Sequence, residues 1–203
     1  MSVVLEAKGV WKIYEMGNNQ VAALKDLSLK VNEGDMVAVM GPSGCGKTTL
    51  LNCLSGLDDL STGEVMVNGE PLFGQGDRIR TSLRAKQLGF IFQKFNLLPV
   101  LTAVENVELP LLLGGAKPQD ARERSLEALD DVGLRDWSSH KPMELSGGQQ
   151  QRVTIARAFV HKPSVILGDE PTGNLDSKTS QEVMDVLFSI NKHHGTTMLI
   201  VTH

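Results

Sequence analysis

Eight consecutive residues have the types and the spacing of a phosphate-binding loop, G-x-x-x-x-G-K-[ST]: Gly41, Pro42, Ser43, Gly44, Cys45, Gly46, Lys47 and Thr48. Glycines let backbone N–H groups turn toward phosphate oxygens, and the helix expected to follow adds the positive end of its dipole. Lys47 is expected to reach the β- and γ-phosphates of a nucleotide, Thr48 to bind Mg²⁺, and Thr49 to lie among the nucleotide contacts. The alternative is an ordinary tight glycine turn, which needs neither the Lys-Thr pair nor an apolar strand before it.

Two carboxylates, Asp169 and Glu170, stand at the end of the apolar run that begins at Val165. Open parallel sheets gather their ligands at the carboxyl ends of strands, so the pair is expected near the phosphates. Asp169 is suited to hold Mg²⁺ through water, and Glu170 to orient or deprotonate the attacking water. On its own the pair could equally be an acidic cap between a strand and a loop, but the phosphate-binding loop upstream favours catalysis.

Several elements must position these residues. The apolar run Met36–Met40 predicts a strand buried on both faces directly before the loop, and residues 48–57 predict a helix after it. Alternating apolar residues predict a small antiparallel β element from residues 3–10, 24–31 and 64–67, with a turn at Asn68-Gly69. Further strands are expected at residues 89–92, 164–167 and 197–201, alternating with helices at 149–160 and 178–190. This alternation predicts an α/β fold with a parallel sheet.

The segment from Phe95 to Met143 has a different character. Four prolines, at positions 99, 110, 118 and 142, are expected to interrupt it, and Leu126, Leu129 and Val132 recur at helical spacing. We expect one domain over residues 1–203, in which 1–92 and 144–203 form the core with its β subdomain and 93–143 form an inserted helical subdomain.

A third motif consists of five residues: Leu145, Ser146, Gly147, Gly148 and Gln149. With this signature the sequence resembles the ATP-binding cassette proteins, and the resemblance runs through the whole chain. Further positions match the family in order: Tyr14 where the family stacks a ring on adenine, Gln93 at the Q-loop, Asp176 in the D-loop and His203 at the switch histidine.

The resemblance implies a P-loop ATPase with ATP and Mg²⁺ as its cofactors. Ser146, Gly147 and Gly148 present a hydroxyl and backbone N–H groups at the start of a helix, which is another anion-binding end. In the family, two copies pair head to tail, so that each signature closes on the γ-phosphate held by the other copy's loop. Hydrolysis then opens this ATP-dependent homodimer.

Three implied roles have plainer alternatives. Tyr14 could be a packed aromatic at a sheet edge, and Gln93 could be a turn glutamine instead of a residue that senses Mg²⁺ and the attacking water. His203 is expected to contact the γ-phosphate and Glu170, or else to be an exposed terminal histidine. Relatives continue past this histidine with further strand and helix, so the C-terminal end of the usual fold is expected to be missing.

Composition excludes some classes of partner. Lys and Arg number 20 against 24 Asp and Glu, and the resulting net charge of −4 provides no general attraction to nucleic acid. The N-terminus shows no secretory leader, and no apolar run approaches the length of a membrane span. We therefore expect a cytoplasmic protein that binds no nucleic acid, and any membrane contact must be local.

Within the family, residues 95–99, 105–107 and 173–176 look like those of the lipoprotein-release, macrolide-efflux and cell-division subgroup. That resemblance implies an integral membrane permease-like partner and a peripheral position on the cytoplasmic face of the inner membrane. The alternative is a soluble cassette ATPase in regulation or repair. The short distance from Gln93 to Leu145 leaves no room for the coiled-coil arm of the repair type, and the signature argues against a P-loop kinase or GTPase.

Overall fold

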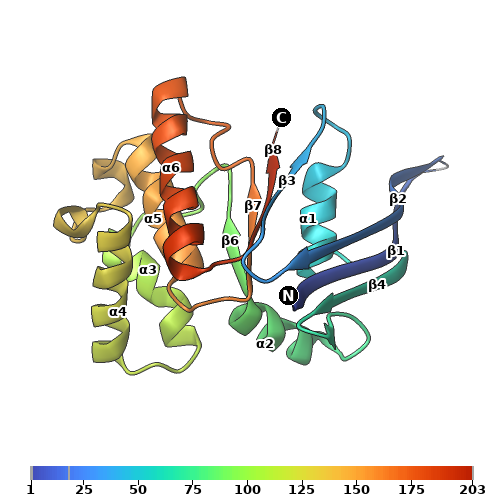
Figure 1. Cartoon of the computed structure of the whole chain (residues 1–203), viewed down its shortest axis with the longest axis horizontal. Helices are drawn as coiled ribbons and strands as arrows, with labels where there is room; N and C mark the ends of the chain where they lie inside the picture. The colour runs from blue at the N-terminus through green and yellow to red at the C-terminus, as the bar shows by residue number, and fades with distance from the viewer. Residues whose placement is uncertain (1, 18, 203) are drawn as a thin grey trace.

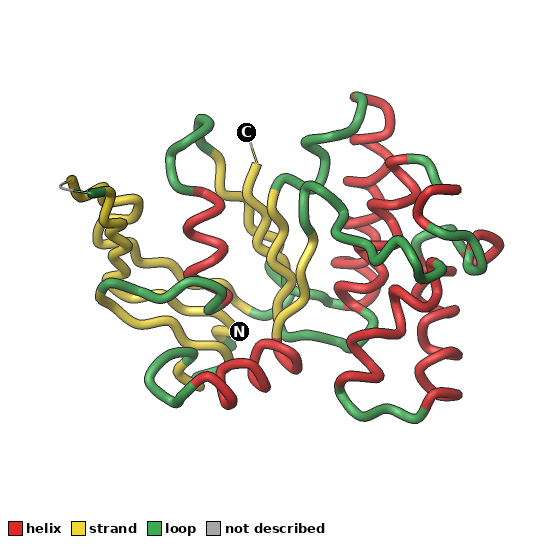
Figure 2. Tube along the Cα trace, turned by 180° about the vertical axis from the view of Figure 1, so that it is seen from behind, coloured by secondary structure: helices red, strands yellow, loops and turns green. Residues whose placement is uncertain are grey.

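The computed structural model describes residues 2–17 and 19–202. Its described strands form an antiparallel sheet of order β2-β1-β4-β5 and a parallel sheet of order β3-β8-β7-β6. The antiparallel sheet lies at one end of the molecule, the parallel sheet in the middle, and most of the helices at the other end (Figures 1 and 2). The expected α/β architecture is present.

The antiparallel sheet is larger than the hydrophobic alternation predicted. It consists of β1 (Val3–Met16), β2 (Asn19–Asn32), β4 (Thr62–Val67) and the short β5 (Glu70–Pro71). The register of β1 against β2 shifts near Gly9 and Asp26, which have φ values of +54° and +47°. Such irregularities break the period-2 pattern, so the pattern ended at Val10 although the strand continues. The predicted turn at Asn68-Gly69 joins β4 and β5, with positive φ at both residues.

The parallel sheet holds the expected strands: β3 (Met36–Met40), β6 (Leu88–Ile91), β7 (Val165–Asp169) and β8 (Met198–Thr202). The prediction that β3 is buried on both faces was wrong. β3 lies at the edge of its sheet, and the Met40 side chain is 71% exposed. Periodicity cannot separate an apolar edge strand from a central one, because the difference depends on what packs beside it.

Three helices flank the parallel sheet. Helix α1 (Lys47–Ser55) lies between the two sheets, where it contacts β1, β2, β7 and β8. Helices α5 (Gly147–Phe159) and α6 (Ser177–His194) lie toward the other side of the sheet (Figure 1). The described apolar side chains accordingly form two cores, one between the sheets around α1 and one around α5, α3 and α4.

The remaining helices are α2 (Asp77–Gln87), α3 (Ala103–Leu113), α4 (Pro118–Asp131) and the 3₁₀ turns η1 (Arg135–Trp137) and η2 (Pro142–Glu144). All but α2 fall in the segment expected to be the inserted subdomain, except that η2 extends one residue past it; the boundaries of the subdomain stay a prediction. None of the described helices is long and apolar enough to cross a membrane.

Pro110 does not interrupt the helical segment as expected, because it lies inside α3. An interior proline removes one helical hydrogen bond and costs about 3 kcal/mol or more. The start of α3 offsets this with a capping box, in which Thr102 N–H donates to Glu105 Oε2 at 2.7 Å. Burial of Val107 and Leu111 on the helix adds to this. Packing and capping therefore outweigh the tendency of Pro110 to interrupt the helix.

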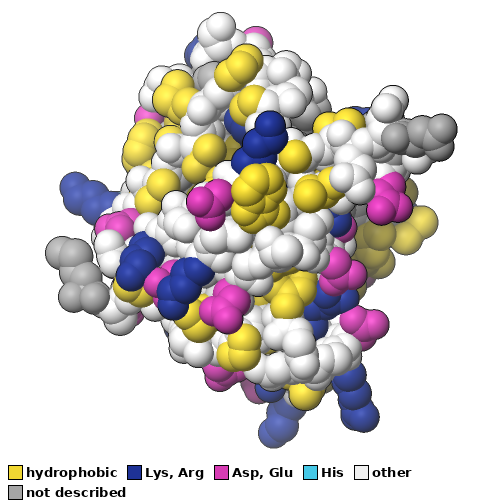
Figure 3. Space-filling model, turned by 90° about the vertical axis from the view of Figure 1, so that its right-hand side faces the viewer, with side chains coloured by type: hydrophobic (Ala, Val, Ile, Leu, Met, Phe, Trp, Pro, Cys, Tyr) yellow, Lys and Arg dark blue, Asp and Glu magenta, His cyan; other side chains and the backbone are white. Residues whose placement is uncertain are grey.

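The surface at the antiparallel end carries charges of both signs among exposed apolar side chains (Figure 3). The positive and negative groups alternate over this face, so it presents no extended basic area. The expectation that the chain binds no nucleic acid stays a prediction.

Candidate active site

The phosphate-binding loop joins β3 to α1 and encloses a hollow of about 480 Å³. Gly44 and Gly46 have φ values of +79° and +95°, a region that favours glycine. A Cβ at Gly46 would come within 2.7 Å of the Ala23 carbonyl oxygen. The loop must therefore keep glycine here to lie against β2. Residues of the loop and of α1 line the hollow: Ser43, Gly44, Cys45, Gly46, Lys47, Thr48 and Thr49.

Lys47 is only 7% exposed, and its ammonium faces the loop. Its Nζ donates to the carbonyl oxygens of Gly41 at 2.7 Å and Pro42 at 3.1 Å. The same Nζ lies 3.8 Å from Glu170 Oε1. The structure thus brings the loop lysine and one of the two predicted carboxylates to the same place, although they are far apart in sequence.

Asp169 ends β7 and lies next to the start of α1. The Thr48 hydroxyl donates to Asp169 Oδ1 at 3.3 Å. Burial raises the pKa of the Asp169 carboxyl above its ordinary value, and the neighbouring Glu170 charge adds to this against the opposing effects of Thr48 and Lys47. A hydroxyl and one carboxylate beside a phosphate hollow fit Mg²⁺, which takes few protein ligands and completes its shell with phosphate and water.

Glu170 has an unusual backbone, with φ of +44°. A non-glycine residue in this region costs about 1 to 2 kcal/mol. Two hydrogen bonds hold the turn, since Glu170 N–H donates to the Val201 carbonyl at 3.0 Å and Gly173 N–H donates to the Glu170 carbonyl at 2.9 Å. The sheet therefore imposes the direction in which this side chain leaves β7, and its carboxylate lines the hollow.

Gln93 lies between β6 and α3, against the loop that follows Glu170. Asn174 Nδ2 donates to the Gln93 carbonyl at 2.8 Å, and Gln93 Nε2 lies 3.5 Å from Asn174 Oδ1. A Cβ at Gly173 would come within 2.7 Å of Gln93 Nε2. The structure brings Gln93 to the segment that follows the carboxylates, but Gln93 does not line the hollow.

The signature forms the start of α5. Ser146 is the N-cap, and it exchanges two hydrogen bonds with Gln149 in a capping box of 2.9 Å and 3.3 Å. Leu145 is buried, whereas Ser146 is exposed. A Cβ at Gly148 would come within 2.4 Å of Thr179 Cγ2 on α6, so this glycine lets the two helices approach. A Cβ at Gly147 would lie 3.3 Å from Leu175 Cδ2, a tight contact to which the leucine side chain would have to adjust by a few tenths of an ångström.

The described side chains do not bring the signature to the hollow of its own chain, because none of residues 145–149 lines it. Asp176 of the expected D-loop is the N-cap of α6, accepting from Lys178 N–H at 3.0 Å and Thr179 N–H at 3.1 Å. A hydrogen bond from the Thr179 hydroxyl to Asp176 Oδ2 at 2.6 Å, followed by these backbone bonds, lowers the pKa of the Asp176 carboxyl. The His203 prediction lies outside the described residues.

Tyr14 lies on β1 directly opposite Val21 of β2, which lines the hollow. Its hydroxyl donates to Asp58 Oδ2 at 2.7 Å, and Lys12 Nζ lies 4.8 Å from its ring centroid. Tyr14 is half-buried and is not itself among the residues that line the hollow. This place suits a base platform, and it is also compatible with plain packing.

The ABC transporter family model matches residues 24–173. The chain belongs to the ABC transporter family. An ABC transporter ATP-binding protein of Thermotoga maritima is 47% identical over 100% of this chain and 86% of its own length. The lipoprotein-releasing system ATP-binding protein LolD of Alcanivorax borkumensis is 48% identical over 98% of this chain and 88% of its own.

A solved structure with the same fold is the dimeric, post-hydrolysis state of the ATP-binding cassette MJ0796 bound to ADP and Pi. It is 45% identical to this ABC transporter family member, with a TM-score of 0.88 over 98% of this chain and 88% of that one. These comparisons confirm the predicted fold class and the predicted ATPase. The individual roles of the site residues stay predictions.

Part of the cassette's hollow had no signal in the sequence. Val21, Ala22 and Ala23 of β2 form one of its walls, yet they read as ordinary residues of an alternating strand. Their contribution arises because β2 lies against the loop at Gly46. Only the close approach of two segments could have revealed it.

Proposed function

We propose that this ABC ATPase binds ATP in the hollow and hydrolyses it to ADP and phosphate in a head-to-tail dimer. The observation that carries this proposal is the separation of the phosphate hollow from the exposed start of α5. The hydroxyl of the exposed Ser146 caps α5, and the N–H groups at the start of a helix attract an anion. A second copy supplies that anion as the γ-phosphate in its own loop.

Within one hollow we assign the steps as follows. Lys47 exchanges its carbonyl partners for the β- and γ-phosphates, and backbone N–H groups of residues 43–48 surround the phosphate oxygens. Thr48 and Asp169 would hold Mg²⁺, which would supply positive charge to the phosphates, and we assign Gln93, outside the hollow's lining, to sense the ion. Glu170 orients and deprotonates the attacking water from the carboxyl end of β7, and His203 supports the γ-phosphate.

We further propose that the dimer acts on an integral membrane partner from the cytoplasmic face of the membrane. The relatives named above as ATP-binding proteins of transporters support this assignment over a soluble enzyme of regulation or repair. A second hollow of about 390 Å³, between α2, β6, α3 and α5, supports it as well, because its lining is mainly apolar. Phe90, Phe92, Leu109 and Leu113 contribute to that lining.

The charges in this second hollow indicate what kind of segment it binds. The guanidinium groups of Arg84 and Arg157 line it and donate to the backbone carbonyls of Gly56, Phe95 and Asn96, which leaves their positive charge unneutralised by those contacts. Phe92, which precedes Gln93, lies in the same wall. We assign the hollow to a cytoplasmic segment of the membrane partner that has an apolar face and an acidic side chain.

The test of the dimer is light scattering after size exclusion on the Glu170→Gln variant. This change removes the base but keeps the size of the side chain, so bound ATP persists and the closed dimer accumulates. We expect a monomer without nucleotide and a dimer with ATP and Mg²⁺, with the hydrolysis rate reduced at least about a hundredfold. A variant that binds ATP and stays monomeric contradicts the head-to-tail assignment, and a chain that does not bind ATP contradicts the site.

A further inference from the structure

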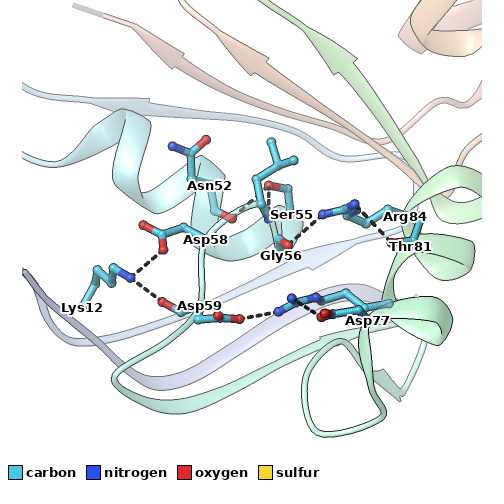
Figure 4. A network of polar contacts seen from close by, with 11 residues as sticks. Lys12, Asn52, Ser55, Gly56, Asp58, Asp59, Asp77, Thr81 and Arg84 are labelled. Atoms are coloured by element: carbon cyan, nitrogen blue, oxygen red, sulfur yellow. Dashed lines mark hydrogen bonds and ion pairs between the residues drawn. The ribbon is translucent and has the colours of Figure 1, made fainter.

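The Tyr14 ring is held by two other side chains. Asp58 accepts the Tyr14 hydroxyl on Oδ2 at 2.7 Å and the Lys12 ammonium on Oδ1 at 2.6 Å. The same ammonium also donates to the Asp59 carbonyl (Figure 4). That bond is 2.7 Å long, and the ammonium lies 4.8 Å from the centre of the Tyr14 ring. One carboxylate therefore joins the tip of the ring to the cation that covers one of its faces.

The carboxylate that makes this link is itself anchored. Asp58 follows the end of α1, where Gly56 turns the chain with φ of +66° and Asp58 N–H donates to the Asn52 carbonyl at 3.1 Å. The next residue, Asp59, pairs with Arg80 of α2, which also pairs with Asp77 at 2.6 Å (Figure 4). Asp58 thus takes its position from α1, and its neighbour is tied to α2.

The electrostatics keep these partners in the states that the bonds require. Burial alone raises the pKa of the Asp58 carboxyl, but the hydrogen bonds from Lys12 and Tyr14 outweigh it and leave the pKa below its ordinary value. Burial, followed by the bond to Asp58, raises the pKa of the Tyr14 hydroxyl against the opposing effects of a hydrogen bond with Thr49 and of the Lys12 charge. Near neutral pH the carboxylate accepts and the phenol donates.

We propose that Asp58 and Lys12 are positioning residues for nucleotide binding, because they hold the Tyr14 ring ready for the base. The inference rests on the proposed function and on the role that the family resemblance implies for Tyr14, a ring that stacks on adenine. Lys12 covers one face of the ring, so the base stacks on the other. A ring that is already fixed at its tip and on one face loses little freedom when the base arrives, which favours binding.

The tests separate the base from the phosphates. Asp58→Ala, Lys12→Met and Tyr14→Phe each remove one part of the support and leave the phosphate loop intact. We expect each to weaken ATP binding about threefold to tenfold and to leave the affinity for inorganic triphosphate with Mg²⁺ unchanged. In steady state, KM for ATP rises by the same factor while kcat stays constant, since the support touches no reacting atom.

Two control variants remove side chains of the same types as Lys12 and Asp58. Lys8→Met removes another lysine of β1, which pairs with Glu6 at 3.2 Å and contacts none of the aromatic rings that the structure describes. Asp77→Ala removes another acid that pairs with Arg80. Both are expected to keep the ATP affinity of the unaltered chain.

Tyr14 is the single tyrosine of the chain, so its ionisation can be followed by the near-ultraviolet absorbance of phenolate. We expect Asp58→Ala to lower the pKa of Tyr14 toward its ordinary value and Asp77→Ala to leave it unchanged. Tyr14→Phe and Asp58→Ala should be non-additive in ATP affinity, because both break the same bond. Tyr14→Phe tests the bond without loss of the ring, even if Asp58→Ala fails to fold.

Two results overturn the proposal, and they are distinguishable. If Tyr14→Ala leaves the ratio of ATP to triphosphate affinity unchanged, Tyr14 is no base platform, and the assignment on which the proposal rests fails too. If Tyr14→Ala lowers this ratio while Tyr14→Phe, Asp58→Ala and Lys12→Met keep it, the platform stands and the positioning role is wrong.

Discussion

Ser146 combines two roles at the start of α5, since its hydroxyl caps the helix and also faces solvent. Substitutions that differ only in charge can separate the capping of α5 from the contact with phosphate. Asn and Asp cap helices about as well as Ser does, so either residue should preserve the fold. They differ in that Asp adds a negative charge at the place where we expect the partner's γ-phosphate.

We therefore compare Ser146→Asp with Ser146→Asn in the Glu170→Gln background. The Asp variant should lose at least about tenfold in ATP-dependent dimer formation, because two negative groups would meet there. The Asn variant should dimerise nearly as well as the parent, and both should bind ATP normally as monomers. Dimer formation is measured by light scattering against ATP concentration. Equal behaviour of the two variants would mean that the signature does not meet phosphate.

Glu170 shows at the same scale how the fold directs a single side chain. Its left-handed backbone is unfavourable for a residue with a Cβ, and bonds to Val201 and Gly173 maintain it. Strain of this kind persists where the surrounding structure over-determines it, which is common at active sites. The carboxylate therefore reaches the hollow because of β8, which lies far along the chain.

At the scale of the elements, α5 packs closely against α6 because Gly148 has no side chain. Gly148→Ala places a Cβ within 2.4 Å of Thr179 Cγ2, so the helices must separate or distort. Overpacking of this kind costs about 1 to 3 kcal/mol. We expect that loss in the free energy of unfolding, measured with urea, together with weaker ATP-dependent dimerisation because the signature shifts.

A second substitution at the same contact should restore the stability that Gly148→Ala removes. Thr179→Ser removes Cγ2 and retains the hydroxyl that donates to Asp176 Oδ2 at 2.6 Å. Combined with Gly148→Ala, it should restore the free energy of unfolding to near the original value, since alanine also favours the helix. Thr179→Ser alone should have a small effect. If the double variant is as unstable as Gly148→Ala, the clash with this methyl group is not the cause.

Arg157 links α5, which begins with the signature, to the segment that follows Gln93. It lies on α5, and its guanidinium donates to the carbonyls of Phe95 at 3.0 Å and Asn96 at 2.7 Å, both of which have positive φ. Burial lowers the pKa of Arg157. These hydrogen bonds tie the signature helix to the segment after Gln93.

For the whole molecule, the assignment of a membrane partner can be tested with washed membrane vesicles from the organism that makes this chain. Leu113 is 83% exposed and lines the apolar hollow. We expect saturable binding of the chain to these vesicles, and a loss of at least about tenfold for Leu113→Asp, which places a charge on an apolar contact and near a partner's acidic group. Co-sedimentation measures the binding.

Two controls decide what the vesicles bind. Phe188→Asp alters another exposed apolar side chain, 53% exposed on α6 and outside the hollow, and should bind like the parent. Protease-treated vesicles should lose the binding. Equal binding to protein-free lipid vesicles would contradict a protein partner, and an unchanged Leu113→Asp would contradict the hollow as its site.

Much of this protein was determined by sequence alone. The phosphate loop, the acidic pair and the signature are contiguous, so their chemistry is set by local residue order. The apolar patterning predicted the strands of the parallel sheet and helices α1, α5 and α6. Contiguous motifs need no knowledge of the fold, because the same few residues make both the turn and the contacts. Family membership followed from them.

Contacts between distant segments were decided by the tertiary structure. β3 is exposed at a sheet edge, Pro110 is accommodated in α3, and Val21 to Ala23 form a wall of the hollow. Asp58 holds Tyr14 from 44 positions away, and Gly148 is required by a methyl group on another helix. Sequence spacing cannot predict these features, since each depends on which surfaces come within a few ångströms of each other once the sheets and helices have packed.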